Sequence, residues 1–359
     1  MGFPYYVWIE WVDDEVLEVE MVSPAIHKQM QQNTSVWGCT YLRATWSRQM
    51  SSSGYHEPVL LDKVMEYLHV MPGGVYADCT VGQGGHTSIL LQKSSPNGVV
   101  LGIDKDQDSL MEAQNRLSSY VNTFIPVQGN YADLNQIAIA NGIITFDGIL
   151  LDLGFSSKQI DGVGYGMSFQ RDEYLDMRFD KTPGTITAAD IINTYSEKEL
   201  ADLIYTYGEE SKSRRLARAI VGRRPISTTK ELADVITIAS PRNTRIHPAT
   251  QTFQALRIAV NDELESIRTG LESSVGLLRE LGRLAVISYH SLEDRLVKGI
   301  FNREASACIC LPEMYECSCN HQPTIKVVNR KVIRPSESEV SRNPRSRSAR
   351  MRVVERLQT

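Results

Sequence analysis

Long apolar runs are missing from this sequence: no stretch of 18 consecutive apolar residues occurs, so no membrane-spanning helix is predicted. An excess of basic charge is missing too, because 38 Lys and Arg stand against 43 Asp and Glu and leave a net charge of -5. That balance gives no overall indication of a nucleic-acid partner, although a mean value does not exclude local basic patches. Six cysteines occur, but four of them lie between Cys308 and Cys319, which is not a disulfide framework and favours a cytoplasmic protein. With 42% hydrophobic and 23% charged residues over 359 positions, the rest is typical of a globular protein of two or more domains.

The first 50 residues differ in composition from the rest of the chain. All four tryptophans lie there, and six acidic residues precede the first basic one, Lys28. This acidity argues against a secretory signal peptide and against a mitochondrial transit peptide. The stretch MSSSGYHEPVLL, which begins at Met50, resembles a natural chain start. We therefore expect residues 1–50 to be a poorly ordered extension whose presence in the native protein is open; a small accessory segment is the alternative.

A glycine-rich turn, TVGQGGH at residues 80–86, follows a short β-prone segment that ends at Asp78. Residues 87–92 have a helical pattern, and residues 98–104 form a second buried-type strand that ends at Asp104. Strand, glycine turn, helix, strand and acid make up the first half of a Rossmann-like unit. Asp104 follows Gly84 by 20 residues, the spacing at which a carboxylate binds the ribose of a nucleoside cofactor.

The dinucleotide fingerprint G-x-G-x-x-G is incomplete, because Thr87 occupies the last glycine position, and no P-loop motif occurs. A looser glycine turn between two acids suits S-adenosylmethionine, which has no pyrophosphate. A dehydrogenase is disfavoured, since no hydride-transfer constellation accompanies the turn. The sequence therefore predicts an α/β fold with a Rossmann-like S-adenosylmethionine-dependent methyltransferase sheet. A turn that serves packing alone is the alternative.

Two further strand ends carry side chains suited to a binding site. Tyr131 follows a third strand, where an aromatic ring would flank adenine, and Asp152 lies at the end of a fourth strand. Ligands of doubly wound sheets bind at the carboxyl ends of the strands. We therefore expect Tyr131 and Asp152 to face the same crevice as Asp78, Gly84 and Asp104.

The tetrapeptide Asp152-Leu-Gly-Phe155 is similar to the D-P-P-Y tetrapeptides of amino-directed methyltransferases, although it lacks the prolines. The exocyclic amine of a base is a weak nucleophile because its lone pair is delocalised into the ring. A carboxylate and a backbone carbonyl that accept its hydrogens favour the nucleophilic form, and an aromatic ring can stack on the flipped-out base. We therefore expect Asp152 and Phe155 to be catalytic without a metal; an aspartate that caps a turn is the alternative.

Eight motifs in chain order make the sequence resemble the bacterial small-subunit (16S) ribosomal RNA cytosine-N4 methyltransferases, the MraW/RsmH family. They are HEPVLL from His56, TVGQGGH from Thr80, DGILLDLGFSS from Asp147, LDMR from Leu175, YGEE from Tyr207, HPATQTFQALR from His247, SYHSLEDR from Ser288 and NPRSRS from Asn343. The resemblance implies methylation of the exocyclic N4 of a cytidine in the decoding region of 16S rRNA. It implies S-adenosylmethionine binding by Gly84, Gly85, His86, Asp104, Tyr131, Asp152 and Gln159. Tyr131 stands where the family pattern has phenylalanine, and the proton acceptor is left open.

Helix signals replace the strand pattern in residues 159–245, with capping boxes that begin at Ser196 and Thr228. Six basic residues cluster there: Lys212, Arg214, Arg215, Arg218, Arg223 and Arg224. This pattern predicts a helical insert that serves as the RNA-binding or substrate domain, and a solvated face paired with local acids is the alternative. From His247 a single long helix is expected to pack on the sheet, because five apolar residues share one face: Phe253, Leu256, Val260, Leu264 and Ile267.

His290 leaves the end of another buried strand, at residues 282–288, and would lie near the target base. It is therefore a third candidate for catalysis, with a structural role as the alternative. Four cysteines, Cys308, Cys310, Cys317 and Cys319, form two C-x-C pairs that would close a structural zinc site. C-x-C is tighter than the usual C-x-x-C spacing, so four plain thiols are the alternative. Residues 342–352 carry five arginines, which suit either phosphate contacts or a solvated tail.

These observations divide the chain into an extension (1–50), a discontinuous methyltransferase domain (51–158 and 246–305), a helical insert (159–245) and a Cys-rich segment with a basic tail (306–359). The expected partner is 16S rRNA, within the small ribosomal subunit, and no membrane. Two other functions remain open: methylation of DNA or protein, and a non-catalytic ribosome-assembly factor. The sequence does not decide whether the chain forms a homodimer.

Overall fold

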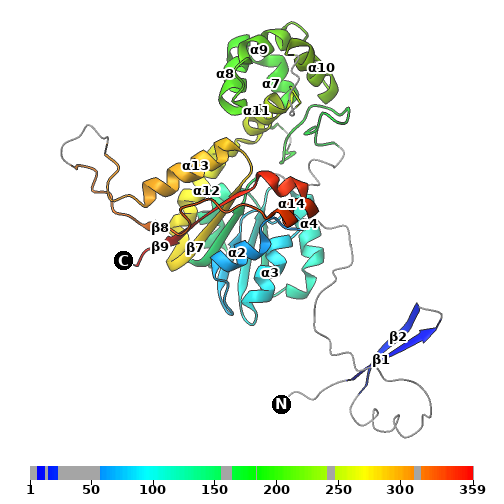
Figure 1. Ribbon diagram of the computed structural model, residues 1–359, viewed down its shortest axis with the longest axis vertical. Helices are drawn as coiled ribbons and strands as arrows, with labels where there is room; N and C mark the ends of the chain where they lie inside the picture. Colours follow the sequence, from blue (N-terminus) through cyan, green and yellow to red (C-terminus); the bar gives the residue numbers. More distant parts are fainter. Residues whose placement is uncertain are drawn as a thin grey trace. The chain divides into compact units, whose positions relative to one another are not determined.

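A seven-stranded sheet of order β5-β4-β3-β6-β7-β9-β8 organises the larger part of the protein (Figure 1). The neighbouring pairs from β5 to β7 are parallel, whereas β9 is antiparallel to both β7 and β8. The strands are β3 (Val75–Asp78), β4 (Val99–Asp104), β5 (Phe124–Gln128), β6 (Phe146–Asp152), β7 (Leu278–Ser288), β8 (Ile325–Val327) and β9 (Arg350–Arg356). This mixed sheet, interrupted by a helical insert, confirms the predicted fold class.

The structure is a computed structural model that describes residues 57–154, 164–182, 184–240, 247–310 and 317–358, and the backbone of two strands nearer the N-terminus. Those strands, β1 (Tyr6–Val12) and β2 (Glu15–Val22), pair antiparallel and belong to a separate unit, residues 1–53. The expectation that residues 1–50 are poorly ordered stays a prediction. Among the described residues, none of the helices combines the length and apolar character needed to cross a bilayer.

Helices cover both faces of the sheet. One layer contains α2 (Leu61–Leu68), α3 (Gly85–Ser94) and α4 (Gln107–Arg116), and the other contains α5 (Leu134–Ala140), α12 (Glu263–Leu277) and α13 (Ser291–Glu304). Side chains of β6 alternate between the two cores, with Ile149 and Leu151 in one and Leu150 in the other. Because both faces are buried, the strand is a continuous apolar run in the sequence rather than an alternating one.

The helical insert lies between β6 and β7 and has a core of its own. Its helices are α7 (Ala188–Thr194), α8 (Glu197–Gly208), α9 (Ser213–Val221), α10 (Thr229–Ala239) and α11 (Thr250–Asn261). The predicted capping boxes are present: Ser196 and Glu199 begin α8, and Thr228 and Glu231 begin α10. A third box, of Thr187 and Asp190, begins α7.

The long helix predicted after His247 is two helices, which is a correction to the sequence analysis. Asp262, with φ of 48°, takes a left-handed conformation between α11 and α12 and breaks the helix. Phe253 and Leu256 of α11 pack in the core of the insert, whereas Ile267 of α12 packs against the sheet. The shared apolar face predicted for the five residues is therefore divided between two cores.

The C-terminal segment completes the sheet, which the expectation of a basic tail did not anticipate. After β8 come α14 (Glu337–Arg342), a 3-10 turn at Pro344–Ser348, and β9, which pairs with β7. Arg350 and Arg352 of β9 both bind the Asp294 carboxylate of α13, at 3.3 and 2.7 Å. Two of the five clustered arginines therefore fix the last strand to a helix. Two other 3-10 turns, Ser118–Tyr120 and Tyr131–Asp133, flank β5.

Candidate functional site

A cavity of about 410 Å³ opens at the carboxyl ends of the parallel strands. This volume lies within the range typical of small-molecule and cofactor sites. Six of the predicted site residues line it: Gly85, His86, Asp104, Tyr131, Asp152 and His290. Predicted residues at or just after the ends of β4, β5, β6 and β7 thus meet those of the glycine turn in one place, as expected for a ligand site of a doubly wound sheet.

The glycine turn combines a cavity wall with a packing position. Gly82 has φ of 51° and lines the cavity, and a Cβ there would meet nothing within 4 Å. Gly84, the residue before α3, has φ of 76°, but a Cβ there would come within 3.1 Å of Leu117 and 3.3 Å of Ala113. Gly84 therefore makes room for α4 and does not line the cavity, whereas Gly82, which was not among the predicted site residues, does.

Asp78 does not line the cavity but supports the turn from beneath. Its carboxylate is buried and accepts hydrogen bonds from the Thr87 hydroxyl (2.7 Å) and the Thr80 N–H (3.2 Å). Burial raises the pKa of Asp78, and the hydrogen bonds to Thr87 and Thr80 oppose that shift. The threonine that breaks the dinucleotide fingerprint thus holds the end of β3 to the start of α3.

Asp104 presents a carboxylate to the cavity while the backbone holds it in place. Its Oδ2 accepts from the Gly82 N–H at 2.7 Å, and its Oδ1 accepts from the Asp106 N–H at 2.9 Å. Burial raises the pKa of Asp104 to about 6, and the two N–H groups oppose this shift. Each oxygen keeps a further lone pair, so the carboxylate can accept from two neighbouring hydroxyls.

Asp152 lies at the end of β6 between a tyrosine and a histidine. The Tyr289 hydroxyl donates to Asp152 Oδ1 at 2.8 Å, and His86 Nδ1 lies 3.8 Å from Oδ2. The other ring nitrogen of His86 lies 2.9 Å from the carbonyl oxygen of Val59, which fixes the ring. Burial raises the pKa of Asp152 to about 6, and the neighbouring His86 ring and the Tyr289 hydroxyl oppose this shift. The carboxylate is therefore held in one orientation at the cavity wall, and with a pKa of about 6 it is ionised at neutral pH.

His290 lines the cavity and also caps α13. Its Nδ1 accepts weakly from the Glu293 N–H at 3.4 Å, and Glu293 accepts in return from the backbone of His290 at 3.3 Å. His290 Nε2 lies 3.0 Å from Glu293 Oε1, although the two are poorly aligned for a hydrogen bond. Burial would raise the pKa of Glu293, but the contacts with His290 outweigh it and leave the pKa lowered. The structural alternative for His290 is thus observed, and a catalytic role stays a prediction.

Tyr131 borders the cavity from the turn after β5. Gly270 of α12 makes room for it, because a Cβ there would come within 2.6 Å of the Tyr131 ring. Lys105 lies on the same side, with Nζ 3.4 Å from both the Ser266 hydroxyl and the Asn261 carbonyl. Burial lowers the pKa of Lys105. Phe155 and Gln159, the other two predicted residues, lie outside the described residues.

Several lining residues were not predicted as site residues. Tyr289 directly follows β7, so the strand-end rule would have found it. Arg257 and Glu263 flank the break between α11 and α12 and form a bidentate ion pair at 2.8 and 3.0 Å. No sequence signal indicated the ion pair of Arg257 and Glu263, because the two side chains meet only where the helix breaks at Asp262.

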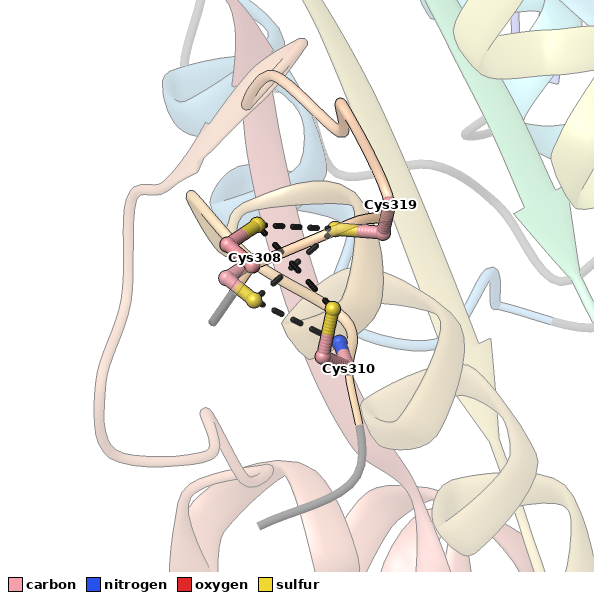
Figure 2. A group of neighbouring side chains, drawn as sticks. Cys308, Cys310 and Cys319 are labelled. Carbon is pink, nitrogen blue, oxygen red and sulfur yellow. Dashed lines mark hydrogen bonds between the residues drawn. The ribbon is translucent and has the colours of Figure 1, made fainter. Parts of the chain in front are cut away.

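The four clustered cysteines lie apart from the cavity, beyond the C-terminal end of α13, and none of them lines it (Figure 2). Their sulfur atoms gather closely enough to hold one metal ion. A second group, Glu263, His290 and Glu293, also comes together, inside the cavity. Each member of this second group already has a partner: Arg257 for Glu263, and each other for His290 and Glu293.

Comparison with known proteins finds a family that matches most of the chain. The model of the MraW methylase family matches residues 53–357. Proteins named ribosomal RNA small subunit methyltransferase H are similar over most of their length. One from Dehalococcoides mccartyi is 51% identical over 303 residues, 84% of this chain and 86% of that protein. One from Thermomicrobium roseum is 47% identical over 319 residues, 88% of this chain and 98% of that protein.

Likenesses to solved structures are weaker. An rRNA methylase from Streptococcus thermophilus has a TM-score of 0.39 at 10% identity, with 83% of this chain and 94% of that chain covered. A fibrillarin from Aeropyrum pernix, with S-adenosyl-L-methionine bound, has a TM-score of 0.35 at 8% identity, with 82% and 73% covered. These scores are too low to bear on the site. The family match and the identity to the two relatives decide the matter: the chain belongs to the MraW methylase family.

Proposed function

We propose that this protein transfers the methyl group of S-adenosylmethionine to the exocyclic N4 of a cytidine in 16S rRNA. The observation that carries the proposal is the meeting of Asp104 and Asp152 across one strand-end cavity, on a chain of the MraW methylase family. The names of the relatives, small-subunit rRNA methyltransferases, support the substrate.

In this proposal the cofactor lies along the glycine turn. Asp104 would accept hydrogen bonds from the ribose hydroxyls, and Gly82 and Gly85 would leave room for the cofactor at the turn. Tyr131 would flank the adenine ring, as the sequence suggested. His86 and Gln159 would complete the site, and Gly84 would act through the shape of the turn.

Asp152 is the residue that we propose to act on the target amine. Its carboxylate would accept one amine hydrogen while a backbone carbonyl accepts the other, and this would favour the nucleophilic form of the nitrogen. The amine nitrogen would then attack the methyl carbon in line with its bond to the sulfonium sulfur. S-adenosylhomocysteine would leave and the nitrogen would lose one proton, so that positioning supplies much of the rate. Phe155 would stack on the base, and His290 would approach it. Neither step needs a metal.

The helical insert would bind the RNA. Five of its six clustered basic residues are exposed: Lys212, Arg214, Arg215, Arg218 and Arg223. The sixth, Arg224, donates instead to the carbonyl oxygens of Ile192 and Tyr195 and so holds the insert together. Exposed guanidinium groups suit phosphate contacts. A cytidine in a folded ribosomal RNA must be turned out of its stack to reach the cavity. Such a substrate would place the reaction in the cytoplasm.

The four-cysteine group enters this proposal only as a structural metal site, because its sulfurs lie outside the cavity that would hold the cofactor. We keep the predicted division into extension, methyltransferase domain, insert and C-terminal segment, with α11 counted with the insert because it packs in that core.

The test is methyl transfer from labelled S-adenosylmethionine to small ribosomal subunits that lack the modification, followed by mass spectrometry of the nucleosides. N4-methylcytidine is expected from the wild-type chain and not from Asp152→Asn. Cofactor binding without label in subunits or in naked 16S rRNA would overturn the substrate and favour DNA or protein. Absence of cofactor binding would favour the assembly factor.

A further inference from the structure

Four cysteine sulfurs converge in the segment between α13 and β8. The Sγ atoms of Cys310 and Cys317 are 4.0 Å apart, those of Cys317 and Cys319 are 3.5 Å apart, and those of Cys319 and Cys308 are 3.8 Å apart. All four lie within 4.8 Å of one another. Figure 2 shows the sulfurs turned toward a common centre from two short stretches of chain.

These separations match the edges of one small tetrahedron. A zinc ion bound by four thiolates at about 2.3 Å in tetrahedral geometry places neighbouring sulfurs about 3.8 Å apart. The three sulfur pairs above lie within a few tenths of an ångström of that length. A disulfide requires sulfurs about 2.05 Å apart, so these thiols are not bonded to each other. A polynuclear iron–sulfur cluster places several irons and sulfides between its thiolates and would hold them farther apart.

The surroundings indicate a ligand rather than ordinary packing. Cysteine is normally a buried, apolar residue, yet Cys308 and Cys317 are exposed and the other two are half-buried. The Ile309 N–H donates to Cys319 Sγ and the Cys310 N–H donates to Cys308 Sγ, each at 3.4 Å. Backbone N–H groups directed at sulfur stabilise thiolates and orient metal ligands. Burial does not bring these four side chains together, whereas a shared ion would account for their approach.

The position of the site indicates what the ion does. The chain leaves α13 and returns to the same point, because the Thr324 N–H donates to the Glu304 carbonyl at 2.9 Å. His321 is the histidine nearest to the four cysteines in sequence, and its Nε2 lies 3.0 Å from the carbonyl oxygen of Arg303, at the end of α13. With 14 residues, α13 places the cysteines about 20 Å from His290 and the cavity. An ion there cannot touch the reacting atoms, but it can close the loop that leads into β8.

We propose that Cys308, Cys310, Cys317 and Cys319 bind one zinc ion as a tetrathiolate site that fixes the connection from α13 to β8. This inference is independent of the methyl-transfer reaction, since metal content can be measured whatever the substrate is. The ion organises the loop and leaves the cofactor site unchanged.

The experiment measures metal in the full-length chain, purified under reducing conditions, by mass spectrometry of the elements. One zinc per chain is expected, and it should be lost in Cys308→Ser combined with Cys319→Ser. Cys39→Ser, the same exchange outside the cluster, should keep the zinc. The affinity for S-adenosylmethionine, measured by calorimetry, should change less than about threefold in the zinc-free variant, since a distant structural ion contributes little there.

A second measurement uses the unaltered chain, in case the variant does not fold. Cobalt(II) exchanged into the wild-type protein should give the intense visible absorption of a tetrahedral thiolate site. Metal-free protein that takes up no cobalt would overturn the proposal, as would several irons per chain or zinc retained in the double variant. Loss of methyl transfer with zinc present would contradict only the proposed function.

Discussion

At the residue scale, Asp104 is the most direct test of the cofactor site. Asp104→Ala removes both carboxylate oxygens that would accept from the ribose. Hydrogen bonds to a charged group contribute about 1.5–3 kcal/mol each, so the loss of two should lower the affinity for S-adenosylmethionine by roughly two to four orders of magnitude. Calorimetry measures it. Asp108→Ala, an exposed aspartate in the first turn of α4, is the matched control. Unchanged affinity in Asp104→Ala would remove that residue from the site.

The pH dependence of binding follows from the same side chain. Burial raises the pKa of Asp104 to about 6, and only the ionised carboxylate accepts from two hydroxyls. Below that pH the free protein holds the proton and must release it to bind. Affinity should therefore be constant above the pKa and fall as the pH drops through about 6. Asp152 has a similar pKa, so the titration is repeated in Asp152→Asn; a midpoint lost in that variant would assign the effect to Asp152 instead.

Tyr289 is expected to act through Asp152, as a positioning residue. Tyr289→Phe removes one hydrogen bond to the carboxylate, and such a bond contributes about 1.5 kcal/mol, so kcat should fall roughly tenfold. Because that bond lowers the pKa of Asp152, the acidic limb of the rate profile should move to higher pH. The KM for S-adenosylmethionine should stay within about twofold, because only an interaction with Asp152 is removed. Tyr120→Phe, outside the cavity, is the control. If the acidic limb of the rate profile does not move in Tyr289→Phe, Tyr289 only packs in the site and does not position Asp152.

Residue-level prediction succeeded where the sequence carries a local rule. An acid at the end of a buried strand and a glycine turn are visible in sequence, and Asp104, Asp152 and Gly85 do line the cavity. The sequence could not show which glycine of the turn lines the cavity and which makes room for packing, because that difference depends on where α4 lies. Gly84 faces Ala113, and Gly82 faces open space. Such a contact joins elements distant in the chain and has no local signature.

At the scale of elements, the C-terminal strand depends on a shared carboxylate. The Asp294 carboxylate binds Arg350 and Arg352 of β9. Burial alone would raise the pKa of Asp294, but the two arginines outweigh it and leave that pKa lowered. Asp294→Asn should lower the free energy of unfolding by about 1–3 kcal/mol, measured by denaturant titration at neutral pH. Since the folded-state pKa is lowered, this contribution is present above the unfolded-state pKa and is lost as the pH falls through the lowered one.

The exposed pair of Glu197 and Arg218 provides the contrast. Their side chains are 44% and 77% exposed, and exposed pairs contribute less than about 1 kcal/mol. Glu197→Gln should therefore change the stability by no more than about 0.5 kcal/mol. Equal effects of Asp294→Asn and Glu197→Gln would mean that the arginines of β9 do not hold the strand.

Element boundaries were predicted well where side chains cap a helix and poorly where the backbone breaks one. Ser196 and Thr228 carry their signal in the sequence, because the capping side chain is itself the cause. Asp262 does not, since aspartate is found both in helices and at positive φ, and the residue type alone does not tell the two apart. The run from Phe253 to Ile267 keeps a helical period across the break, so periodicity alone joins α11 to α12. The last strand, β9, was not predicted, because the arginines at its start are also typical of a solvated tail.

At the scale of the whole molecule, the proposed function assigns the cofactor and the RNA to two different parts of the chain. The sheet and its strand-end cavity suit the cofactor, and the insert between β6 and β7 carries exposed basic side chains on a core of its own. A net charge of -5 hides this division, because the acids and bases are distributed unevenly. The ion pair of Glu209, at the end of α8, with Arg295 of α13, at 2.8 Å, is one contact that joins the insert to the sheet layer.

This division predicts that RNA binding can be weakened without loss of the cofactor. The combined change of Arg214, Arg215 and Arg218 to Ala removes three exposed charges of α9. Affinity for 16S rRNA should fall, and the slope of log affinity against log salt should flatten by about 0.7–0.9 for each phosphate that is no longer neutralised. Filter binding at several salt concentrations measures both, and calorimetry should find the affinity for S-adenosylmethionine unchanged.

The matched control removes three exposed bases outside the insert: Lys63, Lys93 and Arg268. It takes away the same net charge, so a general electrostatic effect would flatten the salt slope equally in both variants. A binding surface on α9 would flatten it only in the first, because released counterions report the phosphates that are touched and not the mean charge. Equal slopes in the two variants would therefore reject the insert as the RNA-binding domain, even if methyl transfer to cytidine were established.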